Sequence, residues 1–506
     1  FGHDIHIQYY FQHIVLQNGF WDWTIPDNYN SCLSLVILSP IYSLVADIKE
    51  VWIFKIVFPI LSSILPLALY GIYRYQVEAK IAFLSTFLFM SIPGGILSLD
   101  SSPGREVAAK LYIALLVLLI VEKKLSNIQK CILAIIFIIS LVFTHYSSAY
   151  MLIALFSIGW IVLQLAKQPK INNLWKRFLR FDLFECNNSS KSSSYSILNI
   201  VIISLLIIIG LTWYMSVSSA SAFNAIVNMG NKVFEGLTGF LDTTTREQVA
   251  LSGLGVGFSK ADILSKIFRI LQYITEVYII VGFFAMLLRS NQLRFQKHFI
   301  VLSVSAALFL FNSIFLPGFS ANLGMRRIYG FTLIFLAPFC IYGAKIIWDG
   351  VVWLFNYALK INTNWQSVYF INNSYLPVMT LTVLIPYFLF ISGFVPAVSN
   401  AYCEVQELNS SAIALGPYKT DRNAFNQMEI SAADRLWNII PANAKVSADL
   451  YSSTLLWEQQ LKRVITISQS GYIPKDSYIF LRSWNIKNNE LLVRLGYAFG
   501  THVNLK

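Results

Sequence analysis

Residues 131–167 read CILAIIFIISLVFTHYSSAYMLIALFSIGWIVLQLAK, which is two apolar blocks separated by a short polar stretch around His145. Each block approaches the length of about 20 residues that an α-helix needs to cross about 30 Å of hydrocarbon. The stretch therefore predicts two membrane-spanning helices that meet at a tight turn, with His145 at its apex.

The same kind of block recurs along the whole chain of 506 residues. Hydrophobic residues make up 56% of the sequence and charged residues only 13%, against about 25% charged in an average soluble protein. The apolar blocks lie near residues 51–74, 81–99, 106–121, 131–145, 147–165, 197–215, 268–288, 299–316, 328–347 and 376–395. This pattern excludes an ordinary soluble enzyme and predicts an α-helical polytopic membrane protein with about ten spans.

The charged residues between the blocks predict the orientation in the cell membrane. If residues 1–50 lie outside, the loops on the inside hold most of the Lys and Arg residues of the membrane part, including those of residues 167–191. This bias is the positive-inside rule, and it accounts for the net charge of +12 without nucleic acid as a partner. The sequence therefore predicts a multi-pass protein whose C-terminal part is extracytoplasmic.

Three parts of the chain differ in composition. Residues 1–50 are predicted to form a first extracytoplasmic segment, with an amphipathic helix that lies along the membrane surface. Residues 51–397 are predicted to form the transmembrane domain, with a second amphipathic run and a Gly-rich stretch in the outer segment 216–262. Residues 398–506 have a soluble composition, and their alternating short helices and strands predict a small extracytoplasmic α/β domain.

Ionisable residues are concentrated on the predicted outer face. Placing such a residue at the centre of a bilayer costs about 2.5–3.5 kcal/mol, so the positions of these residues are informative. The outer segments contain His3, Asp4, His6, Asp100, Arg105, Glu106, His145, Arg326 and Arg327. Glu276 is the main acidic residue deep inside a predicted span. The pattern indicates chemistry at one surface of the membrane.

These residue types suit the transfer of a sugar from a lipid phosphate. That reaction needs an acidic residue to deprotonate the acceptor hydroxyl and cations to hold the phosphate leaving group. Asp4 and Glu106 are the candidate catalytic residues. The planar fork of a guanidinium group fits phosphate oxygens. The candidate phosphate-binding residues are Arg105, His145, Arg326 and Arg327.

Each candidate also has a purely structural interpretation. Asp4 could be a solvated or capping residue, and His145 could be a hydrogen-bonded residue at the apex of its turn. Glu106 stands four residues before Lys110 on a helix, so the two side chains could simply neutralise each other. The paired arginines could anchor lipid headgroups.

A divalent metal ion, Mg or Mn, is the one cofactor that the sequence suggests. His3, Asp4 and His6 are close enough in sequence to supply ligands together. No further ligand accompanies them with a matching spacing, so the three residues define only a partial metal site. The five cysteines show no CxxC spacing and support neither a zinc site nor a disulfide framework.

Several stretches of this sequence have the character of one known family. They are FGHDIHIQYYFQHIVLQNGFWDWTIPDNYNSCLSLVILSPI (1–41), FKIVFPILSSILPLALYGIYR (54–74), GREVAAKLYIALL (104–116) and THYSSAYM (144–151). They resemble the corresponding stretches of an archaeal family of predicted multi-spanning membrane proteins related to the GT-C glycosyltransferases. The resemblance covers most of the first 165 residues and, more loosely, the C-terminal part.

This resemblance implies an enzyme that takes sugar from a polyprenyl or dolichyl phosphate at the outer face of the membrane. The acidic residue typical of the first outer loop of GT-C enzymes corresponds here to Asp4. The charged motif of the next outer loop corresponds to Asp100, or to Arg105 and Glu106. Where many GT-C enzymes have two adjacent acids in the first loop, this sequence has His3 and Asp4, which weakens the case for a metal.

Two functions from different classes are consistent with the sequence. The first is an integral-membrane, GT-C-like glycosyltransferase that moves a sugar, with inversion, from a polyprenyl- or dolichyl-phosphate donor to a cell-surface glycan, lipid or protein. The second is a membrane transporter or a scaffold whose C-terminal domain binds a surface partner. A transporter should have polar residues deep in several spans, whereas here they gather at one face, which favours the enzyme.

Overall fold

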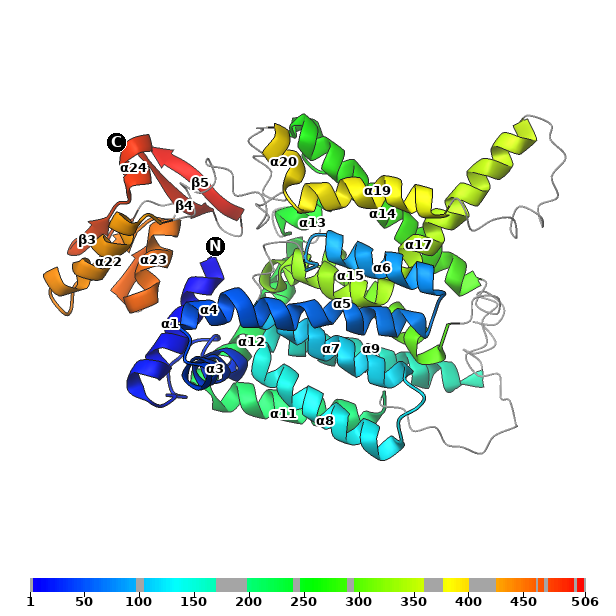
Figure 1. Cartoon of the computed structure of the whole chain (residues 1–506), viewed down its shortest axis with the longest axis horizontal. Helices are drawn as coiled ribbons and strands as arrows, with labels where there is room; N and C mark the ends of the chain where they lie inside the picture. The colour runs from blue at the N-terminus through cyan, green and yellow to red at the C-terminus, as the bar shows by residue number, and fades with distance from the viewer. Residues whose placement is uncertain are drawn as a thin grey trace.

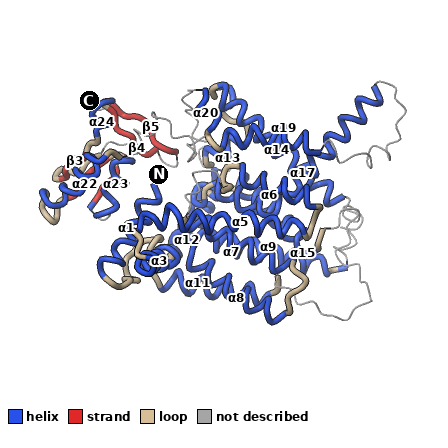
Figure 2. Tube along the Cα trace, in the orientation of Figure 1, coloured by secondary structure: helices blue, strands red, loops and turns tan. Residues whose placement is uncertain are grey.

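The computed structural model describes residues 3–96, 104–169, 198–239, 246–288, 295–358, 376–399, 425–460, 463–467, 472–495 and 498–504. Most of these residues are helical, and the strands are confined to the C-terminal domain, as Figure 2 shows. Figure 1 shows a bundle of roughly parallel and antiparallel helices, with the N-terminal segment and the C-terminal domain at one end of it.

Each predicted apolar block coincides with a helix in the described part of the chain. The bundle helices are α5 (Phe58–Arg74), α6 (Ala79–Ser91), α7 (Arg105–Val121), α8 (Asn127–Thr144), α9 (Tyr146–Lys167), α11 (Ile200–Ser216), α14 (Ile263–Leu288), α15 (Lys297–Phe315), α17 (Met325–Ala358) and α19 (Leu376–Ile391). Among the described residues, six helices are long and apolar enough to cross a membrane, or up to seven if one bent pair counts as a span. The fold is therefore that of an α-helical polytopic membrane protein.

The bundle is apolar on the inside and on much of the outside. Leu65, Leu69 and Ile72 of α5 are fully buried, whereas Ile60 and Leu67 of the same helix are 60% and 70% exposed. A helix that is hydrophobic on all sides is typical of a membrane span, because lipid covers the face that water would cover in a soluble protein.

The crossing of α14 and α17 depends on two glycines. A Cβ atom on Gly282 of α14 would lie 1.9 Å from Phe339 O, and one on Gly343 of α17 would lie 1.8 Å from Tyr278 O. Backbones approach this closely in membranes where small residues meet, since dispersion contacts rather than hydrophobic burial hold such helices together. The crossing fixes α17 against α14.

The end of the bundle near the N-terminus is covered by short elements. They are α1 (His3–Asn18), α2 (Leu33–Val36), α3 (Leu38–Ala46), α4 (Glu50–Trp52), the π-helix η1 (Ile53–Val57), η2 (Ser218–Ala220), α12 (Ser221–Gly236), η3 (Leu237–Gly239), α13 (Gln248–Gly253), η5 (Phe258–Lys260), α16 (Phe319–Leu323) and α20 (Phe394–Ser399). Helix α12 is bent by 94° from α11, so it runs across the bundle end. The predicted surface helix α1 instead packs against protein, namely α2 to α4 and the C-terminal domain.

The C-terminal domain is a small α/β unit. It comprises α22 (Gln427–Ile439), β1 (Lys445–Ala448), α23 (Leu450–Gln460), β2 (Val464–Thr466), β3 (Ser477–Phe480), α24 (Ser483–Asn488), β4 (Glu490–Leu495) and β5 (Ala498–Asn504). Strands β2, β1 and β3 form a parallel sheet in that order, with Val446 opposite both Val464 and Tyr478. An antiparallel hairpin of β4 and β5 follows, which the sequence did not suggest.

Candidate functional site

Charged side chains from distant parts of the chain meet at the bundle end that carries the N-terminal segment. The start of α7 provides Arg105 and Glu106, the turn between α8 and α9 provides His145, and the start of α17 provides Arg327. Helices α7 and α17 both begin at this end, which is why their first turns lie close together (Figure 1).

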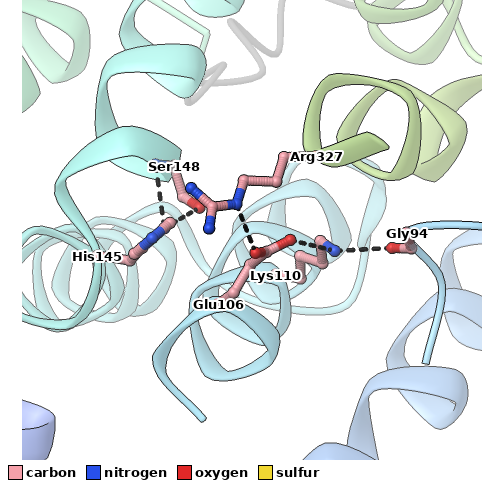
Figure 3. A network of polar contacts seen from close by, with 6 residues as sticks. All are labelled: Gly94, Glu106, Lys110, His145, Ser148 and Arg327. Atoms are coloured by element: carbon pink, nitrogen blue, oxygen red, sulfur yellow. Dashed lines mark hydrogen bonds and ion pairs between the residues drawn. The ribbon is translucent and has the colours of Figure 1, made fainter. Parts of the chain in front are cut away.

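Glu106 lies at the centre of this cluster, as Figure 3 shows. Its Oε1 atom is 2.8 Å from Lys110 Nζ, and its Oε2 atom is 3.1 Å from Arg327 Nε. Lys110 also donates a hydrogen bond of 2.7 Å to Gly94 O, in the turn after α6. Glu106 and Lys110 are buried. The carboxylate therefore joins the starts of α7 and α17, and Lys110 connects both to the turn after α6.

The predicted pairing of Glu106 with Lys110 is present, and Arg327 is a second partner that the sequence did not suggest. The side chain of Arg327 is 34% exposed, whereas that of Lys110 is 3% exposed. Of the two cations that neutralise Glu106, only Arg327 is therefore within reach of a ligand arriving from outside the bundle.

His145 is the N-cap of α9. Its Nδ1 atom accepts a hydrogen bond from Ser148 N and lies 2.7 Å from Ser148 Oγ. The side chain is buried, and this burial lowers the pKa of His145 well below its usual value, with Arg105 adding to the effect and Glu106 opposing it. Burial therefore favours the neutral imidazole, in which Nδ1 accepts from Ser148 N.

Arg105 faces the N-terminal segment. Its guanidinium carbon lies 3.6 Å from the ring centre of Tyr29 and 5.8 Å from that of Tyr146, and Nη1 donates to Cys32 Sγ at 3.5 Å. Arg105 is only 4% exposed. Such stacking on aromatic faces is typical of arginine, and here it holds the N-terminal segment against the start of α7.

Two acidic residues at this end were not among the predicted site residues. Burial raises the pKa of Asp27, which accepts a hydrogen bond of 2.8 Å from Tyr29 N and is attracted to Arg105. Burial also raises the pKa of Glu247, whose Oε2 accepts a hydrogen bond of 2.7 Å from Met325 N at the start of α17. Both lie in the predicted outer segments, which is the signal that could have drawn attention to them.

Arg326 precedes Arg327 on α17, and its backbone lies against the turn after α6. A Cβ on Gly94 would lie 2.3 Å from Arg326 O, and one on Gly330 would lie 2.3 Å from Gly94 O. Glycine at both positions therefore allows the turn after α6 to touch the first turns of α17. The contact fixes the position of the two arginines by their backbone.

The other predicted site residues are only partly described. Asp4 is in the first turn of α1, but its side chain and that of His3 lie outside the description, and so does Asp100. Asp4 precedes Gln8 by one helical turn, and a Cβ on Gly104, directly before α7, would lie 2.7 Å from Gln8 Oε1. The backbone of α1 thus runs past the start of α7.

The described residues do not assemble a metal site. No group of three or more His, Cys, Asp or Glu side chains lies close enough to hold an ion within the described ranges. His6 is paired instead through Nδ1 with Glu458 Oε1 of α23. The metal prediction thus depends on His3 and Asp4, and no chemical step is assigned to an ion.

Comparisons with known proteins identify a family and similar solved structures. The family model described as "Predicted membrane protein (DUF2206)" matches residues 130–502. None of the curated proteins matches the sequence. The chain is similar to an oligosaccharyltransferase of Archaeoglobus fulgidus solved in its apo form, with a TM-score of 0.50 and 10% sequence identity.

That similarity covers 92% of this chain and 60% of the oligosaccharyltransferase, so the chain spans less than two thirds of the length of that enzyme. At this identity the similarity concerns the fold, and it confirms the GT-C-like helical architecture with a small C-terminal sheet.

Proposed function

The chain belongs to the family of predicted membrane proteins DUF2206, and we propose that it is an integral-membrane glycosyltransferase that uses a lipid-phosphate sugar. The donor is a polyprenyl- or dolichyl-phosphate sugar, and the acceptor is an extracytoplasmic glycan, lipid or protein. The charge bias of the loops supports placing the C-terminal domain and the charged cluster outside the membrane.

The observation that carries this proposal is the position of the Glu106–Arg327–Lys110 cluster in an oligosaccharyltransferase-like fold. A buried carboxylate between two cations leaves a net positive charge at the bundle end. Such a charge stabilises a phosphate leaving group, and more strongly in a water-poor site than in water. Arg327 is the residue best placed to contact the phosphate, because part of its side chain is exposed.

The reaction is a single displacement at the anomeric carbon. Asp4 accepts the proton of the acceptor hydroxyl, the acceptor oxygen forms its bond to the anomeric carbon, and the bond from that carbon to the phosphate oxygen breaks. The bonding electrons leave with the phosphate, whose charge Arg327 balances. Attack from the side opposite the phosphate inverts the anomeric configuration.

In this mechanism Glu106 is held by its two cationic partners, so it orients Arg327 and does not act as the base. Arg105 and His145 are buried. They serve the site by holding the N-terminal segment and the α8–α9 turn against the start of α7.

Replacement of Asp4 tests the proposal. Asp4→Asn keeps the size of the side chain but removes the proton acceptor, so transfer should fall by about 10²-fold or more, the usual contribution of a positioned general base. Transfer is measured from a polyprenyl-phosphate sugar in liposomes, with thermal stability recorded in parallel. Asp47→Asn is the matched control, since Asp47 is an exposed residue of the same N-terminal segment whose left-handed backbone suits Asn.

Wild-type turnover in Asp4→Asn would remove Asp4 from the mechanism and direct attention to two half-buried acids, Asp27 and Glu247. Absence of transfer by the wild-type protein with every lipid-phosphate sugar tested, despite lipid binding, would instead favour a transporter or a scaffold.

A further inference from the structure

Helix α1 lies between the C-terminal domain and the start of α7. On one side, His6 Nδ1 pairs with Glu458 Oε1 of α23, and the His6 ring meets that of Phe425 edge-on at 5.6 Å. On the other side, Gln8 is buried next to Gly104. Residues two apart on a helix point about 200° away from each other, so these contacts hold α1 from opposite faces.

The contact with the C-terminal domain is also apolar and extends into that domain. Trp457, the residue before Glu458, packs against the core that contains Ile7 and Phe11 of α1. Phe425 in turn lies under the Arg482 guanidinium, whose carbon is 5.2 Å from the ring centre. Arg482 is fully buried inside the domain. The position of α1 is thereby linked to the core of the C-terminal domain.

Asp4 shares this helix, two residues before His6 and one turn before Gln8. Rotation of α1 about its own axis would change the direction of residue 4 relative to the start of α7. The pair of His6 and Glu458 opposes that rotation from the side of α1 that faces away from α7.

We propose that Glu458 and His6 are positioning residues for the transfer reaction, and that their pair fixes the rotation of α1, and with it the backbone position of Asp4, relative to the start of α7. This inference rests on the proposed function, because it concerns the geometry of the same base. It gives the C-terminal domain a direct part in setting the rate of the chemical step.

A double-mutant cycle tests the pair. Glu458→Gln and His6→Asn each disrupt the contact between the His6 ring and the Glu458 carboxylate and should each lower kcat by about 10-fold, since a small misplacement of a reacting group costs one to two orders of magnitude. The KM for the donor should stay within about 2-fold, because the phosphate contacts of Arg327 are unchanged. Residues in direct contact are coupled, so the double variant should be no slower than either single variant.

A charge exchange separates positioning from general loss of structure. The variant His6→Glu with Glu458→His restores the pair in reverse and should recover kcat to within about 3-fold of wild type. Asp476→Asn is the control for removing an acid from the C-terminal domain, since Asp476 is exposed before β3. Asp476→Asn should leave kcat and the KM for the donor unchanged.

Hydrogen exchange of the backbone amides of α1 provides a readout that needs no substrate. Both single variants should exchange faster in residues 5–12 and the charge-exchange variant should not. Unchanged exchange in the single variants would overturn the inference, even if the wild-type protein transfers no sugar and the proposed function itself fails.

Three kinetic results would also overturn it: single variants with wild-type kcat, losses that add in the double variant, or a charge-exchange variant as slow as the single variants. If His6 acted as a metal ligand, His6→Asn would be slow and Glu458→Gln normal, and this outcome also contradicts the proposal.

Discussion

Helix α7 has a glutamate at each end, and the two residues have different surroundings. Glu106, in its first turn, is buried and pairs with Lys110 and with Arg327 from a helix far along the chain. Glu122, directly after its last turn, is more accessible and accepts hydrogen bonds from the Tyr75 hydroxyl and from the backbone N–H groups of Lys123 and Lys124. These contacts lower the pKa of Glu122.

Glu122 is therefore a structural cap of α7, whereas Glu106 belongs to a preorganised charged site. Glu122 is satisfied by its own neighbours in the chain and by the Tyr75 hydroxyl. Glu106 pairs with Lys110, one turn away on the same helix, and with Arg327, which only the complete fold brings to it, and burial of such a cluster is unfavourable unless every charge is paired. Of the two ends of α7, the first turn is therefore the one that carries a buried charged cluster.

The largest expected effect is on stability, from removing the charge of Glu106. Glu106→Gln removes the carboxylate charge that pairs with Lys110 and Arg327 and should destabilise the protein by about 3–5 kcal/mol, the usual cost of breaking a buried ion pair. Glu122→Gln should cost about 0.2–1 kcal/mol, as for exposed pairs. Unfolding in detergent, followed by circular dichroism, measures both. Equal losses in the two variants would mean that the ends of α7 do not differ as described.

A smaller effect is expected on donor binding. Arg327→Ala removes the partly exposed cation and should raise the donor KM about 10- to 100-fold, because a charge-assisted hydrogen bond is worth about 1.5–3 kcal/mol. Arg74→Ala is the control at the opposite end, where Arg74 donates a hydrogen bond to Val77 O. A donor KM that rises equally in both variants would argue against a phosphate site at Arg327.

The smallest effect concerns pH and Asp27. Burial raises the pKa of Asp27 in the folded protein, so folding favours its protonated form. The stability that comes from protonated Asp27 is therefore fully present below the pKa that Asp27 has in the unfolded chain. It is lost as the pH rises through the higher pKa of Asp27 in the folded protein. Asp27→Asn mimics the neutral form and should melt higher than wild type at neutral pH, with the difference disappearing in acid. A variant that melts lower than wild type at neutral pH would show that Arg105 outweighs burial.

The helices were predictable because hydropathy is a local property of the sequence. The block before His145 and the one after it became α8 and α9, and the composition change after residue 398 marked the C-terminal domain. The bend between α11 and α12 could not be read from sequence. At the bend, Ser218, Ser219 and Ala220 have a left-handed backbone conformation. Glycine is the residue that indicates such a conformation in a sequence, and none is present at these three positions.

The candidate site was predictable only where partners are close in sequence. Lys110 follows Glu106 by four residues, so helix periodicity places it beside the carboxylate. Arg327 is on another helix, and Glu458 is in another domain, so only the folded chain brings them to Glu106 and His6. Asp27 and Glu247 were overlooked because their raised pKa values depend on burial. The sequence of a polar loop does not indicate whether an acidic residue in it will be buried.

Helix α17 is longer than a bilayer is thick. Its 34 residues span about 50 Å at 1.5 Å per residue, against about 30 Å of hydrocarbon, and membrane helices tilt by at most about 40°. Tilt alone cannot absorb this mismatch, so one end of the helix must extend beyond the hydrocarbon. The stacked rings of Trp353 and Tyr357 lie in its last turns, and aromatic residues of this kind suit a membrane interface. If these turns lie at the interface, the two rings limit the depth of the helix, and with it the height of Arg327 near its other end.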